Sequence, residues 1–217
     1  MIEFSRDTEI WTATINRPEK ANSLTHEMLV SLAEFMEDAQ SARAVILTGK
    51  GKVFSAGADL EEARAGLATS DIWERLSGAI AALPGLSICA MNGTLAGGAM
   101  GMALASDLRI AVPSAKFFYP VMKLGFLPQP SDPARMAALI GPARTKLILM
   151  GGQKITADDA LLYGLIDRIV DADTIMDTAR DFAADTVAAP PKIAKDIKAM
   201  CTPAPAISPA IGHPPLR

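Results

Sequence analysis

The chain has 217 residues, of which 50% are hydrophobic and 21% are charged, and its formal net charge is −3 at pH 7. This length allows one domain with a sizeable core, and the weak negative charge gives no basic field for nucleic acid. Cys89 and Cys201 lie far apart, without Cys-x-x-Cys spacing or neighbouring histidines, so we expect neither a disulfide framework nor a metal site. The longest apolar stretch, around residues 95–105, falls short of the roughly 18 residues that indicate a membrane span.

The first part of the chain alternates between strand and helix signals. Residues 9–15 are rich in Ile, Trp and Thr and predict a strand. Thr25 is a suitable N-cap for a helix over residues 26–40, which has one apolar face. A buried strand is expected over residues 44–48, and after a Gly-Lys turn residues 53–55 lead into Ala-Gly-Ala-Asp. The first eleven residues are polar and of mixed charge, which is not typical of a signal peptide, so we expect a cytoplasmic protein.

The rest of the chain is organised around residues 91–107, which follow a predicted helix over 70–83 and a buried strand over 86–91. Asn92-Gly93 favours a turn, and a run of small residues then leads into a helix near Met100. A helix start without side chains leaves its first N–H groups open to a ligand. The helix dipole favours negative charge there, including charge that develops during a reaction. The stretch therefore indicates an oxyanion-stabilising helix N-terminus.

Two other interpretations fit the same glycines. Gly97 and Gly98 could simply let the helix pack closely on a sheet. The dinucleotide fingerprint G-x-G-x-x-G nearly fits, but its first glycine would be Ala96. No acidic residue follows about 20 positions later at a matching strand end, so we do not expect a dinucleotide site.

The second half continues the alternation of strands and helices, which places the chain in the α/β class. Strands are expected over residues 108–112, 116–119 and 166–170, and helices after the capping residues Ser131 and Thr156 and over residues 173–188. The predicted core spans residues 1–188. A shortened helix and a Pro-rich tail are expected over residues 189–217.

Four segments together resemble the crotonase superfamily, the family of enoyl-CoA hydratases and isomerases. They are residues 16–24 (NRPEKANSL), residues 45–60 with VILTG and FSAGADL, residues 92–107, and residues 155–170 (ITADDALLYGLIDRIV). No single segment is specific, but all four in this order and spacing are. The resemblance implies a crotonase-like spiral of ββα turns, an acyl-CoA ligand, and a homotrimer or a hexamer made of two trimers. It implies no cofactor, because coenzyme A is part of the substrate.

In that family two backbone N–H groups polarise the thioester carbonyl and hold the enolate that follows. By position they correspond to Ala58 and Gly98, which are the implied catalytic residues. The resemblance and the positions in the chain also mark eleven residues as substrate-binding: Lys20, Ala21, Asn22, Ser55, Ala56, Asp59, Leu60, Gly97, Tyr119, Val121 and Gln129. Asp59 is at the same time a candidate N-cap for a helix that begins near Leu60.

The two glutamates that hydratases of this family use for proton transfer are missing. One lies three residues after the second oxyanion donor, where this chain has Gly101, and the other follows a proline, where it has Val121. General acid–base catalysis is typically worth about 10²–10⁴-fold, so ordinary hydration should be nearly abolished. Other polar residues near the expected pocket are Tyr119, Lys123, Gln129, Ser131, Asp132 and Glu62. We expect Glu62 on a solvated helix surface and Asp132 in a helix cap.

Three functions fit this sequence. The first is an enoyl-CoA hydratase/isomerase family protein that stabilises an enolate of an acyl-CoA thioester. The second is a decarboxylase for a malonyl-type thioester, because the departing CO₂ leaves its electrons behind and no base is required. The third is a catalytically silent protein that binds acyl-CoA.

Overall fold

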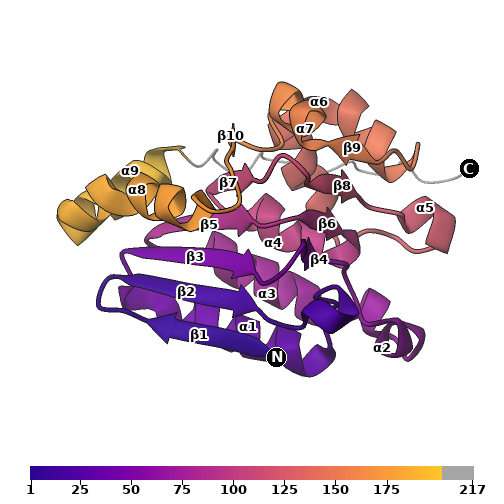
Figure 1. Cartoon of the computed structure of the whole chain (residues 1–217), viewed down its shortest axis with the longest axis horizontal. Coiled ribbons are helices and arrows are strands. Elements are labelled where there is room, and N and C mark those ends of the chain that lie inside the picture. Colours follow the sequence, from indigo (N-terminus) through magenta and orange to yellow (C-terminus); the bar gives the residue numbers. More distant parts are fainter. Residues whose placement is uncertain (202–217) are drawn as a thin grey trace, which may run out of the picture.

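A six-stranded sheet forms the centre of the computed structural model, which describes residues 1–201 (Figure 1). The strand order is β1 (Ile2–Arg6), β2 (Ile10–Ile15), β3 (Ala44–Gly49), β5 (Leu86–Met91), β7 (Leu108–Ala111) and β10 (Arg168–Ile169). β1 pairs antiparallel with β2, and the remaining pairs are parallel. β3 and β5 are almost completely buried, as their continuous apolar sequences predict for central parallel strands.

A second sheet contains the short strands β4 (Val53–Ser55), β6 (Thr94–Ala96), β8 (Lys116–Phe118) and β9 (Ile155–Thr156), in that order. Each of the first three follows a long strand of the first sheet: β4 follows β3, β6 follows β5, and β8 follows β7. A helical segment comes after each pair, so the chain advances in repeated ββα turns. An isolated bridge between Leu24 and Ala58 extends the pairing beyond β4.

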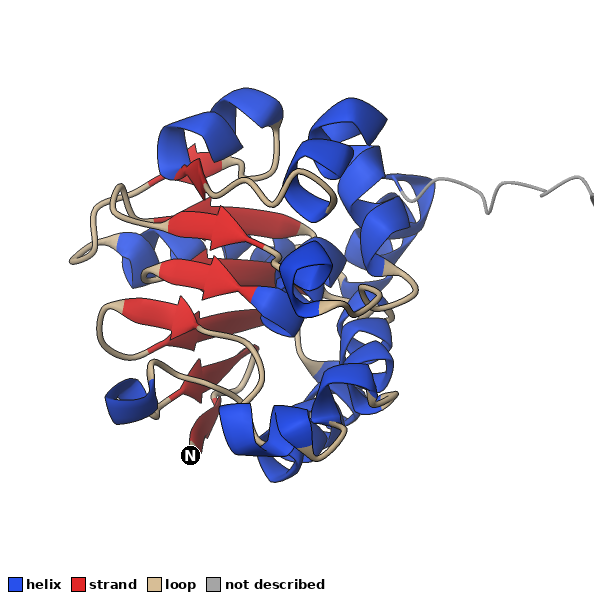
Figure 2. Cartoon of the chain, turned by 90° about the vertical axis from the view of Figure 1, so that its right-hand side faces the viewer, coloured by secondary structure: helices blue, strands red, loops and turns tan. Residues whose placement is uncertain are grey.

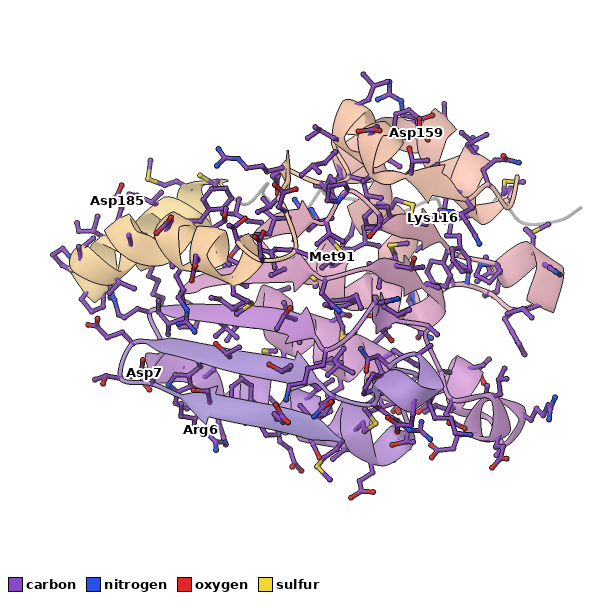
Figure 3. The ribbon with its side chains drawn as sticks, in the orientation of Figure 1. Arg6, Asp7, Met91, Lys116, Asp159 and Asp185 are labelled. Carbon is purple, nitrogen blue, oxygen red and sulfur yellow. The ribbon has the colours of Figure 1, made fainter. Side chains whose placement is uncertain are left out.

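Helices surround these strands, and Figure 2 shows most of them on one side. They are α1 (His26–Asp38), α2 (Leu60–Arg64), α3 (Ile72–Ala81), α4 (Met100–Ala105), α5 (Val121–Leu124), α6 (Asp132–Leu149), α7 (Ala157–Tyr163), α8 (Ile175–Ala188) and α9 (Pro191–Cys201). Short 3-10 turns cover Pro18–Lys20, Ala39–Ser41, Leu67–Thr69 and Gly97–Ala99. α1 packs on α3, α3 on α4 and α4 on α6, whereas α8 packs against β3, β5 and β7. Met91, at the end of β5, lies in the interior between these layers (Figure 3).

Several local predictions are confirmed. The Thr25 side chain accepts a hydrogen bond from the Met28 N–H and caps α1. Thr156 and Asp159 form the predicted capping box of α7, which ends at Gly164 in the left-handed conformation. Asp59 caps α2 by accepting from the Glu61 N–H. No helix within residues 1–201 is long and apolar enough to cross a membrane.

Other local predictions are wrong. β1 had no counterpart among the predicted elements, because it is an edge strand whose side chains are mostly exposed and which therefore gives no clear apolar signal. The strand expected over residues 166–170 shrinks to Arg168–Ile169. The predicted Pro-rich segment beyond residue 201 lies outside the described residues.

The start of α6 also differs from the prediction. Ser131 occupies the N-cap position but makes no capping hydrogen bond, because its backbone is already helical. Its N–H and Oγ instead donate to the Glu74 carboxylate, at 2.8 Å and 2.7 Å. Asp132 does not cap the helix either, and its side chain is fully buried.

Candidate active site

The second sheet brings three chain segments to one edge. β4, β6 and β8 are parallel neighbours, so their carboxyl ends point the same way. Each strand is followed at once by residues that the sequence marked: Ala56 to Ala58 after β4, Gly97 and Gly98 after β6, and Tyr119 after β8. Ligand sites in sheets of parallel strands commonly lie beyond the carboxyl ends of the strands. The strand order therefore predicts a site at this edge.

The loop after β4 presents the N–H of Ala58 away from the chain that it pairs with. Leu24 makes its two backbone hydrogen bonds to the neighbours of Ala58: its N–H donates to Gly57 O, and its C=O accepts from the Asp59 N–H, both at 2.8 Å. In parallel pairing the residue between two such partners directs its own N–H to the opposite side. Ser55 links the loop to the neighbouring segment, since its Oγ donates to Asn22 O and accepts from the Gly57 N–H.

The two loops that follow β4 and β6 touch through their glycines. Gly57 and Gly97 both have positive φ angles, 91° and 61°. A β-carbon on Gly57 would stand 2.9 Å from Ala96 O, closer than real side chains approach. Glycine at position 57 is therefore needed both for the backbone angle and for the contact.

Gly98 is the second residue of the 3-10 turn Gly97–Ala99, which continues into α4. The first N–H groups of a helix have no partner within the helix, so the Gly98 N–H is available to a ligand. A β-carbon on Gly98 would lie 3.2 Å from the Trp73 ring, whose Nε1 donates to Leu67 O at 2.8 Å. Close packing thus also favours glycine here, so the packing and oxyanion interpretations of this glycine both apply.

Both loops line one cavity of about 370 Å³. Its walls are mostly apolar and come from Ala56, Ala58, Leu60, Ala63, Arg64, Ala68, Trp73, Ala96, Gly97, Gly98, Phe118, Tyr119, Pro120, Val121, Leu124, Phe126, Leu127 and Gln129. Leu60 and Leu127 are 74% and 86% exposed, so the rim of the cavity is apolar and open to solvent. Within residues 1–201, the lining includes one cation, Arg64, and no carboxylate.

The cavity brings together eight of the thirteen residues that the sequence marked: Ala56, Ala58, Leu60, Gly97, Gly98, Tyr119, Val121 and Gln129. Ser55, Asn22 and Ala21 lie directly behind the Ala58 loop and hold it, because the Ala56 N–H donates to Ala21 O. Lys20 is exposed at the end of a 3-10 turn.

Comparison with known proteins identifies the family. The profile described as enoyl-CoA hydratase/isomerase matches residues 5–205. The chain belongs to this family.

Individual members of the enoyl-CoA hydratase/isomerase family are similar over most of their length. The 1,2-epoxyphenylacetyl-CoA isomerase of Escherichia coli is 34% identical over 186 residues, which cover 80% of this chain and 71% of that protein. Carnitinyl-CoA dehydratase of Citrobacter koseri is 32% identical, with 88% and 76% covered. A crystal structure of an enoyl-CoA hydratase from Bacillus anthracis superposes with a TM-score of 0.84 at 31% identity, over 91% of this chain and 81% of that one. The predicted fold class, an α/β crotonase-like spiral, is confirmed.

Asp59 has a structural environment within this enoyl-CoA hydratase/isomerase fold. Besides capping α2, its carboxylate accepts a 2.8 Å hydrogen bond from Arg17 Nη1. The Arg17 guanidinium is the main reason that the pKa of Asp59 is lowered from its usual range. Glu62 also has a partner that the sequence did not suggest, since it accepts from the His26 N–H at 2.6 Å, at the start of α1.

Gly101 and Val121, the two positions at which the resemblance led us to expect glutamates, have different surroundings. Val121 lines the cavity, whereas Gly101 is buried in α4. A β-carbon on Gly101 would meet Asp132 Oδ1 at 2.9 Å, so the Asp132 carboxylate fills the space beside this glycine. Burial raises the pKa of Asp132 to about 7.

Sequence reasoning missed the parts of the site that come from distant segments. Trp73 was predicted only as part of a helix, and the apolar residues of α5 and the following loop carried no motif. For Asp132 the sequence contains one signal. Ser131 and Asp132 are both capping residues before Pro133, and only one of them can occupy the N-cap position, so the other side chain is left to make a different contact. Among the residues described here, no cluster of His, Cys, Asp and Glu is suited to hold a metal ion.

Proposed function

We propose that the protein binds an acyl-CoA thioester in this cavity and stabilises the enolate of the acyl group through the N–H groups of Ala58 and Gly98. The observation that carries the proposal is the convergence of these two residues, from adjacent parallel strands, on one apolar cavity. Backbone donors of this kind stabilise an oxyanion because they are already oriented when the charge develops. The related proteins whose names specify CoA thioesters support this choice of substrate.

Ordinary hydration of an enoyl-CoA is not part of the proposal. Hydration requires a group that activates water and a group that delivers a proton to the α-carbon. The described part of the chain places no carboxylate in the cavity lining for either task, since position 121 is valine and position 101 is a buried glycine. Isomerisation or exchange of an α-proton, which passes through the same enolate, fits the cavity better.

A decarboxylase for malonyl-type thioesters is the second candidate, and Arg64 favours it. Arg64 is the cation among the lining residues and offers a partner for the second carboxylate of such a substrate. Loss of CO₂ would leave its electrons in the enolate held by Ala58 and Gly98. The change Arg64→Met should then weaken binding of methylmalonyl-CoA more than binding of butyryl-CoA.

The experiment is incubation of the protein with butyryl-CoA, crotonyl-CoA and methylmalonyl-CoA in D₂O, followed by mass spectrometry. Deuterium at the α-carbon of butyryl-CoA, or loss of CO₂ from methylmalonyl-CoA, supports enolate stabilisation. Rapid addition of water to crotonyl-CoA would contradict our interpretation of Gly101 and Val121. Saturable binding without any turnover would assign the protein to the third class, a silent acyl-CoA-binding protein.

Assembly as a homotrimer, or as a hexamer of two trimers, also belongs to this proposal, as does a cytoplasmic location. The support for assembly is family membership together with exposed apolar side chains away from the cavity, such as Leu162 on α7. Light scattering coupled to size-exclusion chromatography measures the mass directly. A monomer at micromolar concentration would contradict the proposed assembly.

A further inference from the structure

A buried carboxylate lies directly behind the wall of the cavity. The Tyr119 hydroxyl donates a 3.0 Å hydrogen bond to Asp132 Oδ2 and accepts a 3.3 Å hydrogen bond from the Gln129 N–H. Tyr119 and Gln129 line the cavity, whereas Asp132 does not and is 0% exposed. Tyr119 therefore connects the cavity to a carboxylate that has no contact with solvent.

The second oxygen of this carboxylate has no hydrogen-bond partner among residues 1–201. Asp132 Oδ1 is buried and unpaired, and it lies against Gly101. A buried carboxylate without full hydrogen bonding is costly, so packing and stability alone do not explain it. The position of this carboxylate is informative, because it accepts a hydrogen bond from Tyr119, a residue of the cavity wall.

The charged groups around Asp132 come from two helices. Glu74 on α3 is turned toward Ser131 and raises the pKa of Asp132, whereas Arg135 on α6 lowers it. α4, with the sequence MGMALA, adds no ionisable group. Burial outweighs the hydrogen bond from Tyr119, and the pKa of Asp132 is about 7. Burial also raises the pKa of Tyr119, so the phenol stays protonated at neutral pH.

We propose that Tyr119 and Asp132 form a proton relay for the α-carbon of the bound thioester. The α-proton passes to the Tyr119 oxygen while the Tyr119 hydroxyl proton passes to Asp132 Oδ2. The electron pair of the broken C–H bond remains on the substrate as the enolate, and its negative charge replaces the charge that Asp132 loses. The reverse transfer returns a proton to the enolate. This inference rests on the proposed function, which supplies the enolate.

The hydrogen bonding of Tyr119 suits both directions. A hydroxyl has one donor and two acceptor sites, and Tyr119 uses its donor toward Asp132 and one acceptor site toward Gln129. One acceptor site remains for the substrate proton. Because the pKa of Asp132 is near neutrality, its ionised and neutral forms are both populated, as proton transfer in each direction requires. Tyr119 is the catalytic residue in this scheme, and Asp132 positions it and receives its proton.

The test measures α-proton exchange of butyryl-CoA in D₂O for the full chain and two variants, Tyr119→Phe and Asp132→Asn. Each should lower the exchange rate at least about 100-fold, the lower range of general acid–base catalysis. Binding of butyryl-CoA, measured by calorimetry, should be retained. Matched controls are Tyr163→Phe, which changes the other tyrosine, and Asp158→Asn, which changes an exposed aspartate. Both controls should exchange like the unmodified protein.

The pH profile separates a relay from a structural role. For the unmodified protein, exchange should rise with pH to a plateau, with a midpoint near 7, and residual exchange in Asp132→Asn should lack this step. Equal rates and equal pH profiles in both variants would overturn the relay while leaving the proposed function intact. Absence of turnover with all three thioesters in the unmodified protein would instead contradict the proposed function itself.

Discussion

Asp132 Oδ1 lies 2.9 Å from the point at which a β-carbon on Gly101 would stand. A side chain at position 101 and the carboxylate at position 132 therefore compete for the same volume. The absence of a side chain at position 101 is therefore what makes room for the buried carboxylate of Asp132.

The first prediction tests this competition by stability. Gly101→Ala should destabilise the protein by about 1–3 kcal/mol, as overpacking typically does, although the same change in a helix with free space is favourable. In an Asp132→Ala background the penalty should disappear, because the obstructing carboxylate is gone. Urea unfolding of the four proteins measures the coupling. Gly78→Ala in α3, where nothing lies within 4 Å, is the control and should stabilise. Additive effects at positions 101 and 132 would contradict the competition.

The second prediction concerns pH and Asp132. Its pKa is about 7 in the folded protein, above the ordinary value of an aspartate, so the folded state binds more protons than the unfolded state between these values. Stability should therefore be highest near pH 4 as far as Asp132 is concerned, and should fall as the pH rises toward about 7. The free energy of unfolding should change by about 1.4 kcal/mol for each unit by which the pKa of Asp132 differs between the folded and unfolded states. Asp132→Asn should remove this decline of stability with rising pH. Thermal unfolding of the variant across the pH range measures it, and a decline that persists in the variant would show that Asp132 is not its cause.

The third prediction concerns Asp59, whose effect on the pH dependence of stability is opposite to that of Asp132. Arg17 lowers its pKa in the folded state, so its contribution is present at neutral pH and is lost as the pH falls through the lowered folded value. Asp59→Ala removes both the α2 cap and the ion pair, and should cost about 1–2 kcal/mol at pH 7. A double-mutant cycle with Arg17→Met isolates the ion pair. If the two changes were independent, the pair would not be what lowers the pKa.

The fourth prediction concerns the proposed oxyanion donors. Gly98→Ala places a methyl group 3.2 Å from the Trp73 ring, so the helix start or the ring must move. The kcat/KM for exchange or decarboxylation should fall, up to the 100- to 1000-fold range seen when one such donor is removed (about 3–4 kcal/mol). Gly78→Ala serves again as the control, because it adds the same methyl group at a position that does not line the cavity and has open space around it. Unchanged kcat/KM in Gly98→Ala would argue against the Gly98 N–H as a donor.

Residues with strong local signals were predicted well from the sequence. Thr25, Asp59 and Thr156 cap helices through neighbours two or three positions away, and the apolar runs of β3 and β5 required burial in a central sheet. The order of motifs was enough to identify the family. The helix caps depend on contacts between near neighbours in the chain, and the buried strands depend on continuous apolar runs, so both are visible in the sequence.

What the sequence did not reveal depends on distant contacts. The capping prediction for Asp132 followed from its position before Pro133, but burial against α4 and a hydrogen bond from Tyr119 determine its actual role. Likewise, Ser131 bonds to Glu74 of another helix. No local pattern specifies which helix faces an aspartate, so the pair of Tyr119 and Asp132 could only be found in three dimensions.

The loop after β4 packs so closely on the loop after β6 that a β-carbon on Gly57 would meet Ala96 O, whereas Leu124, Phe126 and Leu127 form a separate, exposed part of the cavity wall. Substitutions in that wall can change its shape without disturbing the loops that would hold the carbonyl. Under the proposed function, the choice of acyl chain would thus be altered by changing a short surface segment while the proposed oxyanion donors stay in place. For an engineer, residues 122–127 are the natural first library, and the glycines at positions 57, 97 and 98 are best left unchanged.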